Sequence, residues 1–281
     1  MSDVREASAP AMNQQNRTGP NPEGDFIWYE LMTTDADGAK AFYDSVVGWS
    51  FGEGAEEYQG YRMINTSDGG FAGGVMPINA EMQQHGARPT WLGYLNVANV
   101  DDKVASIEAA GGKALMGPMD IPNVGRIAMV ADPQGAPFYV MKPIPPEGRE
   151  SEPSTVFSPK DQGRCAWNEL STSDPVAARR FYGEQFGWTT DNFMPMGEHG
   201  EYRFIDHQGL TLGAISGTMG AQHPHWRFYF RVPSVGRAKE MAEANGGTIV
   251  MGPMEVPGGD HIAQCFDPQG GPFALHERKR A

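Results

Sequence analysis

Apolar and polar residues alternate along this chain in two ways, with a period of two in some segments and at helical spacing in others. Residues 26–34 (FIWYELMTT) alternate as a strand does. Past Asp35 the spacing becomes helical, and one face carries the apolar residues Ala39, Phe42, Tyr43 and Val46. Asp35 is a favourable N-cap and Gly48 a favourable helix stop, so a helix is predicted between them.

A second strand and helix follow, at residues 91–97 (WLGYLNV) and from Val100 to the glycine pair that begins at Gly111. Short apolar segments come next, joined by a turn at residues 132–135 (DPQG), which fits a hairpin. The order of one strand, one helix and three strands therefore occurs twice. This order predicts an α+β fold with helices on one side of a curved sheet.

The whole pattern is then repeated later in the chain. The segment WYELMTTDADGAKAFYDSVVGW from Trp28 matches WNELSTSDPVAARRFYGEQFGW from Trp167, and DPQGAPF from Asp132 matches DPQGGPF from Asp267. The second copy also has a helix cap, Asp174, followed by a proline at the first helical position. We therefore predict a disordered tail over residues 1–23, module one over 24–144, a linker over 145–162 and module two over 163–281.

The Asp-capped helix that carries AFY or RFY and ends in GW, placed within a paired βαβββ unit, resembles the vicinal oxygen chelate superfamily of glyoxalases, bleomycin-resistance proteins and extradiol dioxygenases. The resemblance covers almost everything from Gly24 onward except the linker. It implies two tandem glyoxalase-like modules, each a cupped mixed sheet with helices on its outer face. It also implies that many relatives hold a divalent metal ion in the cup.

The resemblance places the metal ligands on the first strand, on the strand before the second helix and on the last strand of each module. In this chain those positions are Trp28, Leu92 and Tyr139 in module one, and Trp167, Arg227 and Ala274 in module two. Divalent metals bind imidazole, carboxylate or thiolate groups, and none of the six residues supplies one. We therefore expect no metal ion and no other cofactor, because the chain also lacks a phosphate loop or dinucleotide motif.

Strand alternation identifies the side chains that share the cup of module one with these positions. Glu30 is the one carboxylate on this face and a candidate catalytic base. The candidate ligand-binding residues are Trp28, Met32, Leu92, Tyr94, Tyr139 and Met141. An apolar, aromatic cup with few polar groups is typical of a small-molecule site, and it favours a hydrophobic or cationic ligand. Pairing of Glu30 with Arg62 is the structural alternative.

The cup of module two carries more charge. Its candidate catalytic residues are Glu169, Arg227 and His276, and its candidate ligand-binding residues are Trp167, Tyr229 and Arg231. Two arginines favour an anionic ligand, so we expect the two cups to differ and any chemistry to occur in module two. Pairing of Glu169 with Arg227 or Arg203 is again the structural alternative, and the tryptophans are alternatively core residues.

The amino-acid composition limits the classes of partner that this protein is expected to bind. The chain has 22 Lys and Arg against 35 Asp and Glu, a net charge of −13, which disfavours nucleic acid and anionic membranes. Its two cysteines, Cys165 and Cys265, suit small core residues of a cytoplasmic protein without disulfides, and its first residues lack the apolar segment of a secretion signal. Six of the seven histidines lie in module two, and we expect them at the surface.

We conclude from the sequence that this is a metal-independent, glyoxalase-like protein that binds a small organic molecule in one or both cups. The alternative is a metal-independent lyase, isomerase or hydroxylase-type enzyme, with Glu169 or Glu30 as general base and Arg227 stabilising an oxyanion. We expect a monomer or weak dimer whose two modules pack as an internal pseudo-dimer. The sequence leaves open whether the two units of each cup come from one module or are exchanged between modules.

Overall fold

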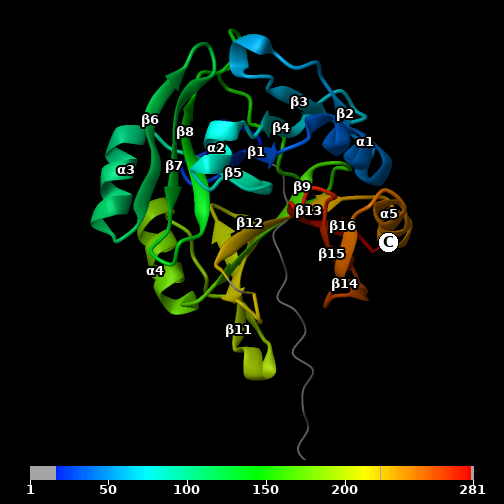
Figure 1. Ribbon diagram of the computed structural model, residues 1–281. Coiled ribbons are helices and arrows are strands. Elements are labelled where there is room, and N and C mark those ends of the chain that lie inside the picture. The colour runs from blue at the N-terminus through cyan, green and yellow to red at the C-terminus, as the bar shows by residue number, and fades with distance from the viewer. Residues whose placement is uncertain (1–16, 222, 280–281) are drawn as a thin grey trace, which may run out of the picture.

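The computed structural model describes residues 17–221 and 223–279, which form two eight-stranded sheets (Figure 1). Module one contains β1 (Phe26–Thr33), α1 (Ala36–Val47), β2 (Ser50–Phe51), the 3-10 turn η1 (Glu56–Tyr58), β3 (Arg62–Asn65), β4 (Phe71–Pro77), α2 (Ala80–Gln84), β5 (Thr90–Asn96), α3 (Val100–Ala109), β6 (Lys113–Ile121), β7 (Gly125–Ala131) and β8 (Pro137–Pro143). Module two contains β9 (Cys165–Thr172), α4 (Pro175–Phe186), β10 (Phe193–Pro195), the 3-10 turn η2 (Gly197–His199), β11 (Glu201–His207), β12 (Leu210–Gly217), β13 (His225–Arg231), α5 (Val235–Ala244), β14 (Thr248–Glu255), β15 (His261–Phe266) and β16 (Pro272–Glu277).

Each sheet is built from the two βαβββ units of a single module. The strand order is β2-β3-β4-β1-β5-β8-β7-β6 in module one and β10-β11-β12-β9-β13-β16-β15-β14 in module two. The two units meet where β1 runs antiparallel to β5, and where β9 runs antiparallel to β13. The α+β class and the tandem glyoxalase-like modules are therefore confirmed, and the units of each cup are not exchanged between modules.

Local sequence explains where the helices begin and end. The side chain of Asp35 accepts a hydrogen bond from the backbone N–H of Gly38 at 2.9 Å, and α1 ends at Gly48 with φ of 84°. Asp174 caps α4 in the same way, through the backbone N–H of Ala177. Only glycine adopts the left-handed conformation without strain, so Gly48 sets the length of α1.

The helix-bearing face of each sheet is packed against the other module. Helix α1 contacts α5 on one side of the molecule and α3 contacts α4 on the other, as Figure 1 shows at right and left. Between them lies one continuous apolar core, in which Tyr29 of β1 contacts Phe228 of β13 with ring centroids 5.0 Å apart. The cups are the opposite faces of the sheets, which carry no packed module and therefore point away from each other.

Two tyrosines join the modules through reciprocal hydrogen bonds. The hydroxyl of Tyr43 in α1 donates to Asp267 of module two at 3.0 Å, and that of Tyr182 in α4 donates to Asp132 of module one at 3.1 Å. Both aspartates are buried members of the DPQG turns, where backbone N–H groups also bind them. Each tyrosine also accepts a hydrogen bond from an indole, that of Trp91 or Trp226, so no polar atom of this contact lacks a partner.

Three expectations need correction or qualification. Of the predicted tail, residues 1–16 lie outside the described part of the chain, but residues 17–23 are packed, because Arg17 binds Asp25 at 2.8 Å and the carbonyl of His207 at 2.9 Å. The predicted linker has no helix or strand in residues 145–162, yet its Val156 is buried. His207 is not a surface residue, since it is 3% exposed and lies 2.9 Å from Asp25 across the module boundary.

Both cysteines are buried and free, as expected for small core residues. No helix in the described residues is long and apolar enough to cross a membrane.

We predict that Tyr43→Phe lowers the free energy of unfolding by about 1–3 kcal/mol, because it leaves a buried indole N–H without its acceptor and a buried carboxylate oxygen without this donor. Tyr182→Phe should cost a similar amount, since it removes the equivalent contact. Urea unfolding measures both. The control is Tyr58→Phe, whose hydroxyl makes only an exposed contact of 3.4 Å. Equal stability of Tyr43→Phe and this control would contradict the role of the contact.

Candidate functional site

Strands β1, β5, β7 and β8 form the floor of the module-one cup. The register sets Trp28 opposite Tyr94, Glu30 opposite Leu92, and Tyr94 beside Tyr139. All six predicted ligand-binding residues of module one belong to one apolar cluster or pack against it, namely Trp28, Met32, Leu92, Tyr94, Tyr139 and Met141. The structure therefore brings together the residues that strand alternation assigned to this face.

Glu30 lies at the bottom of this cup with few partners. It is 2% exposed, and its Oε2 atom accepts a hydrogen bond from the Tyr94 hydroxyl at 2.8 Å. Its Oε1 atom is buried and has no hydrogen-bond partner among the described residues. The proposed pairing with Arg62 does not occur, because Arg62 binds Asp37 at 2.6 Å instead. Glu30 is thus a buried carboxyl group, and no cationic side chain in the described part of the chain binds it.

Burial raises the pKa of Glu30 to about 7, because a carboxylate loses its hydration there. The hydroxyl groups of Tyr94 and Tyr139 lower this pKa only in part. Burial also raises the pKa of both tyrosines, and the nearby charge of Glu30 adds to this effect. The phenols therefore remain protonated at neutral pH, whereas Glu30 changes between its acid and carboxylate forms near pH 7.

Methionines cover the floor of this cup. Four half-buried methionines pack on the cluster, Met76 from β4, Met82 from α2, Met116 from β6 and Met129 from β7. Helix α2 lies in the connection between β4 and β5, in front of the sheet in Figure 1. Methionine is unbranched and adapts its shape to a neighbour more readily than other apolar side chains. The cup is therefore lined by flexible apolar side chains.

The carboxylate of module two has many partners. Glu169 Oε2 accepts hydrogen bonds from Tyr202 at 2.8 Å and from Tyr229 at 3.0 Å. Its Oε1 atom lies 3.7 Å from Arg227 and 3.4 Å from the amide nitrogen of Gln264. The expected alternative, a pair between Glu169 and Arg227, is thus present, whereas Arg203 binds Glu201. Trp167 joins the same network, since its indole donates to Tyr202 at 2.8 Å.

Arg231 and His276 lie apart from this network, at the end of β13 that borders the linker. Arg231 is 2% exposed and donates to the carbonyl of Pro159 at 2.6 Å. It also lies 3.3 Å from Nδ1 of His276, whose Nε2 is 2.9 Å from Asp260. These contacts hold the linker against module two and give neither residue a contact with Glu169.

Three polar residues of the cups were not predicted from the sequence, namely Tyr61, Tyr202 and Gln264. Tyr61 accepts a hydrogen bond from the Trp28 indole at 2.7 Å, and Tyr202 has the same role in module two. The repeated Tyr-Arg pairs at 61–62 and 202–203 were the available signal, but the tyrosine and not the arginine faces the cup. A glycine at position 74 makes room for Tyr61, because a Cβ atom there would overlap the phenol. Gln264 carried no signal, since nothing in its strand pattern marks it as a partner of Glu169.

The positions that the resemblance assigns to metal ligands do not fit a metal ion. Module one offers Trp28, Leu92 and Tyr139 there, none of which is a usual ligand. Among residues 17–221 and 223–279, no three His, Cys, Asp or Glu side chains are grouped to hold a metal. Neither cup offers a divalent ion the donors that it needs at these positions.

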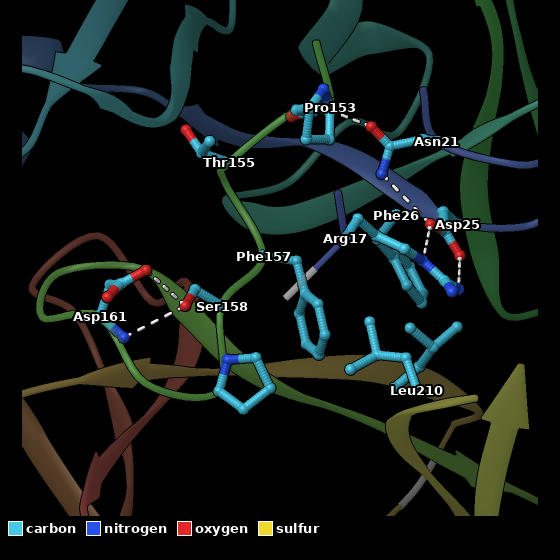
Figure 2. Close-up of a pocket in the computed structure, with 13 residues that line it drawn as sticks. Arg17, Asn21, Asp25, Phe26, Pro153, Thr155, Phe157, Ser158, Asp161 and Leu210 are labelled. Atoms are coloured by element: carbon cyan, nitrogen blue, oxygen red, sulfur yellow. Dashed lines mark hydrogen bonds and ion pairs between the residues drawn. The ribbon is translucent and has the colours of Figure 1, made fainter. Parts of the chain in front are cut away.

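A separate cavity lies at the boundary between the N-terminal segment, the linker and module two (Figure 2). Its volume is about 90 Å³, well below the several hundred cubic ångströms of typical small-molecule sites. Figure 2 shows Arg17 bound to Asp25 at one side and Phe157 facing Leu210 across the space. None of its lining residues belongs to the predicted set of either cup.

Comparison with known families agrees with this architecture. A family model described as the Glyoxalase/Bleomycin resistance protein/Dioxygenase superfamily matches residues 26–140 and again residues 163–275. The chain belongs to this superfamily. The two matched segments coincide with the two eight-stranded sheets, so the duplication seen in the sequence is a duplication of the superfamily's module.

Several proteins resemble the chain over most of its length. "Putative glyoxylase CFP32" of Mycobacterium bovis is 29% identical over 251 residues, covering 88% of this chain and 92% of that protein. "Anthracycline biosynthesis protein DnrV" of Streptomyces peucetius is 30% identical over 263 residues, covering 89% and 92%. Among solved structures, the Mn(II)-bound glyoxalase from Novosphingobium aromaticivorans has a TM-score of 0.61 at 18% identity, covering 92% of this chain and 83% of that one. The 2,3-dioxygenase LapB from Pseudomonas sp. KL28 has a TM-score of 0.60 at 13% identity and covers 94% of each chain. At these identities the solved structures show a shared fold.

We predict that Glu30 makes the protein less stable as pH rises from about 5 to about 8. The folded pKa of about 7 lies above the ordinary value of 4.5, so the folded state binds the proton more tightly than the unfolded state in this range. Relative to Glu30→Gln, the wild type should lose about 2.5 kcal/mol of unfolding free energy between pH 5 and pH 8. Urea unfolding of both proteins at several pH values measures the difference. Parallel stability curves would contradict a raised pKa at Glu30.

Proposed function

We propose that this protein binds a small organic molecule in the cup of module one, without a metal ion. The observation that carries the proposal is Glu30, a buried carboxyl group with one unpartnered oxygen at the floor of an aromatic and methionine-rich cup. A buried polar atom without a partner is unfavourable and rare in folded proteins, and a ligand that supplies the missing partner would account for it here. The surrounding apolar side chains supply the hydrophobic contacts of such a site.

The ligand class that fits this cup is flat and at least partly aromatic. Tyr94 and Tyr139 stack with centroids 4.2 Å apart and an interplanar angle of 15°, so flat rings already pack face to face in this cup, and a flat ligand would extend the stack. Two relatives are named for anthracycline biosynthesis, and anthracyclines are flat aromatic compounds. This agreement supports a ligand of that general shape.

Module one is the better candidate for the ligand, although the charged residues of module two first favoured the second cup. Glu169 already has two phenols, an amide and an arginine around it, so a ligand would have to displace existing partners. Glu30 has two phenols beside it, those of Tyr94 and Tyr139, but no arginine, and one of its oxygens has no hydrogen-bond partner. The cost of replacing internal contacts is therefore lower in module one.

A second candidate function is proton transfer by Glu30. A general base works best with a pKa near the operating pH, and Glu30 has a pKa of about 7 and no arginine beside it. The reaction would be an isomerase or lyase step that begins with removal of an acidic C–H. Exchange of the acidic hydrogens of 2-tetralone for deuterium, catalysed by the wild type and abolished in Glu30→Gln, would favour this function over binding alone.

We predict that 2-naphthol, used as a flat aromatic probe, shifts the methyl NMR signals of the cup methionines. In protein labelled at the methionine methyl groups and dialysed against a chelator, the signals of Met32, Met82 and Met141 should move because of aromatic ring currents. Met219 is exposed in module two, outside this cup, and serves as an internal control. Shifts confined to Met251 and Met254 of module two, or binding that requires added Mn²⁺, would contradict the proposal.

A further inference from the structure

We propose that the ligand of the module-one cup carries a protonated amine, which lies against Glu30 and takes the place of the missing internal cation. This inference rests on the proposed function and names its ligand class, an aromatic organic ammonium ion. It concerns the charge at one atom of the cup, Oε1 of Glu30, which is buried and unpartnered.

In the described part of the chain, no basic side chain neutralises Glu30. The arginines of module one that could reach across the sheet have other partners in the described structure. Arg62 binds Asp37 at 2.6 Å, Arg126 binds Asp101 and Asp120 at 2.6 and 3.0 Å, and Arg88 donates to backbone carbonyls. A buried carboxylate is stable only when a cation or several donors compensate its charge. In the free protein a bound proton neutralises the Glu30 carboxylate, as the raised pKa of Glu30 indicates.

Module two shows how the same fold neutralises the equivalent carboxylate, Glu169, with a residue of its own. Cross-strand pairing sets Arg227 opposite Glu169 on β13 and β9. At the equivalent place in module one, Leu92 lies opposite Glu30 on β5 and β1. Module two therefore contains an internal cation, 3.7 Å from its carboxylate, where module one has an isobutyl group. A ligand cation would restore in module one the charge pair that module two builds from its own residues.

The walls of the module-one cup are aromatic and apolar. Trp28 and the stacked rings of Tyr94 and Tyr139 surround the carboxyl group, and aromatic faces attract organic cations. The titratable groups that face Glu30 are Tyr61, Tyr94 and Tyr139, whose pKa values burial raises, so they stay neutral. The segments that contribute to the cup from β4, α2 and β7 bring Met76, Met82, Ile127 and Met129, which carry no charge. Nothing described in this cup would repel an ammonium ion.

Binding then exchanges one cation for another. An ammonium ion enters beside the neutral acid form of Glu30, the acid proton leaves to solvent, and a carboxylate–ammonium pair remains. No covalent bond to carbon forms or breaks. The number of protons released per ligand is therefore close to one at about pH 6 and falls towards zero at about pH 8.5.

The test uses three naphthalene probes of nearly equal size with calorimetry on the full chain. These are 1-naphthylmethylammonium, the neutral 1-naphthylmethanol and the anionic 1-naphthoate. At about pH 8 the ammonium probe should bind about ten-fold more tightly than the alcohol, and the carboxylate more weakly than either. Titrations in buffers of different ionisation enthalpy count the released protons.

Glu30→Gln should remove the preference for the ammonium probe while the alcohol still binds, because only the charge is lost. Leu92→Arg should do the same by supplying the internal cation that module two has; if it does not fold, Glu30→Gln decides alone. The matched control is Glu108→Gln, which removes an equal charge at an exposed site on α3 and should leave the preference intact.

Equal affinities for ammonium and alcohol, or a preference that survives in Glu30→Gln, would overturn the assignment of an ammonium ligand and leave the proposed function standing. If none of the three probes binds or shifts the cup methionine signals, the proposed function itself fails. The two failures are therefore distinguishable.

Discussion

The rest of the structure depends on two reciprocal hydrogen bonds between the modules, each from a tyrosine hydroxyl to an aspartate. Tyr43 reaches Asp267 and Tyr182 reaches Asp132, and each aspartate belongs to the turn that joins the last two strands of the opposite sheet. Because these polar groups sit inside an aromatic core, they bind only when both modules are in place. They fix the helix-bearing faces against each other and leave both cups on the outside (Figure 1).

This arrangement frees the two cups to differ. The residues of the shared core face inward and are constrained by the partner module, whereas cup residues such as Leu92 and Arg227 are constrained only within their own sheet. In module two a polar network surrounds Glu169. In module one the carboxyl group of Glu30 has an unpartnered oxygen and lies under a cover of methionines. A duplicated fold thus carries one cup that compensates its own charge and one that does not.

The sequence predicts the fold well because its signals are local or periodic. The caps at Asp35 and Asp174 and the 139-residue offset from Trp28 to Trp167 each require only neighbouring residues or the chain compared with itself. Strand alternation also assigns the cup residues of module one correctly to one face, because side-chain direction follows from register.

Strand alternation does not predict which of several possible partners a long side chain binds. It gave no reason for Arg62 to prefer Asp37 over Glu30, or for Arg231 to bind the linker carbonyl of Pro159. The packing of residues 17–23 and the burial of His207 depend on a contact between segments about 190 residues apart, which no local pattern reports. One of the covering methionines, Met82, lies on the short helix α2, whose position over the sheet also depends on the tertiary structure.

Glu30 is a buried carboxyl group whose charge no internal cation compensates in the described structure, and we propose that a ligand compensates it. The most direct measurement is a pH titration of the side-chain carboxyl signals in protein labelled with carbon-13 at glutamate, with Glu30→Gln identifying the signal. The account predicts one signal, absent from the variant, that titrates near pH 7 and moves to its carboxylate position when an aromatic ammonium ion is added at about pH 6. A Glu30 signal that titrates near the ordinary value of 4.5 would contradict it, because the group would then already have the partner that the structure lacks.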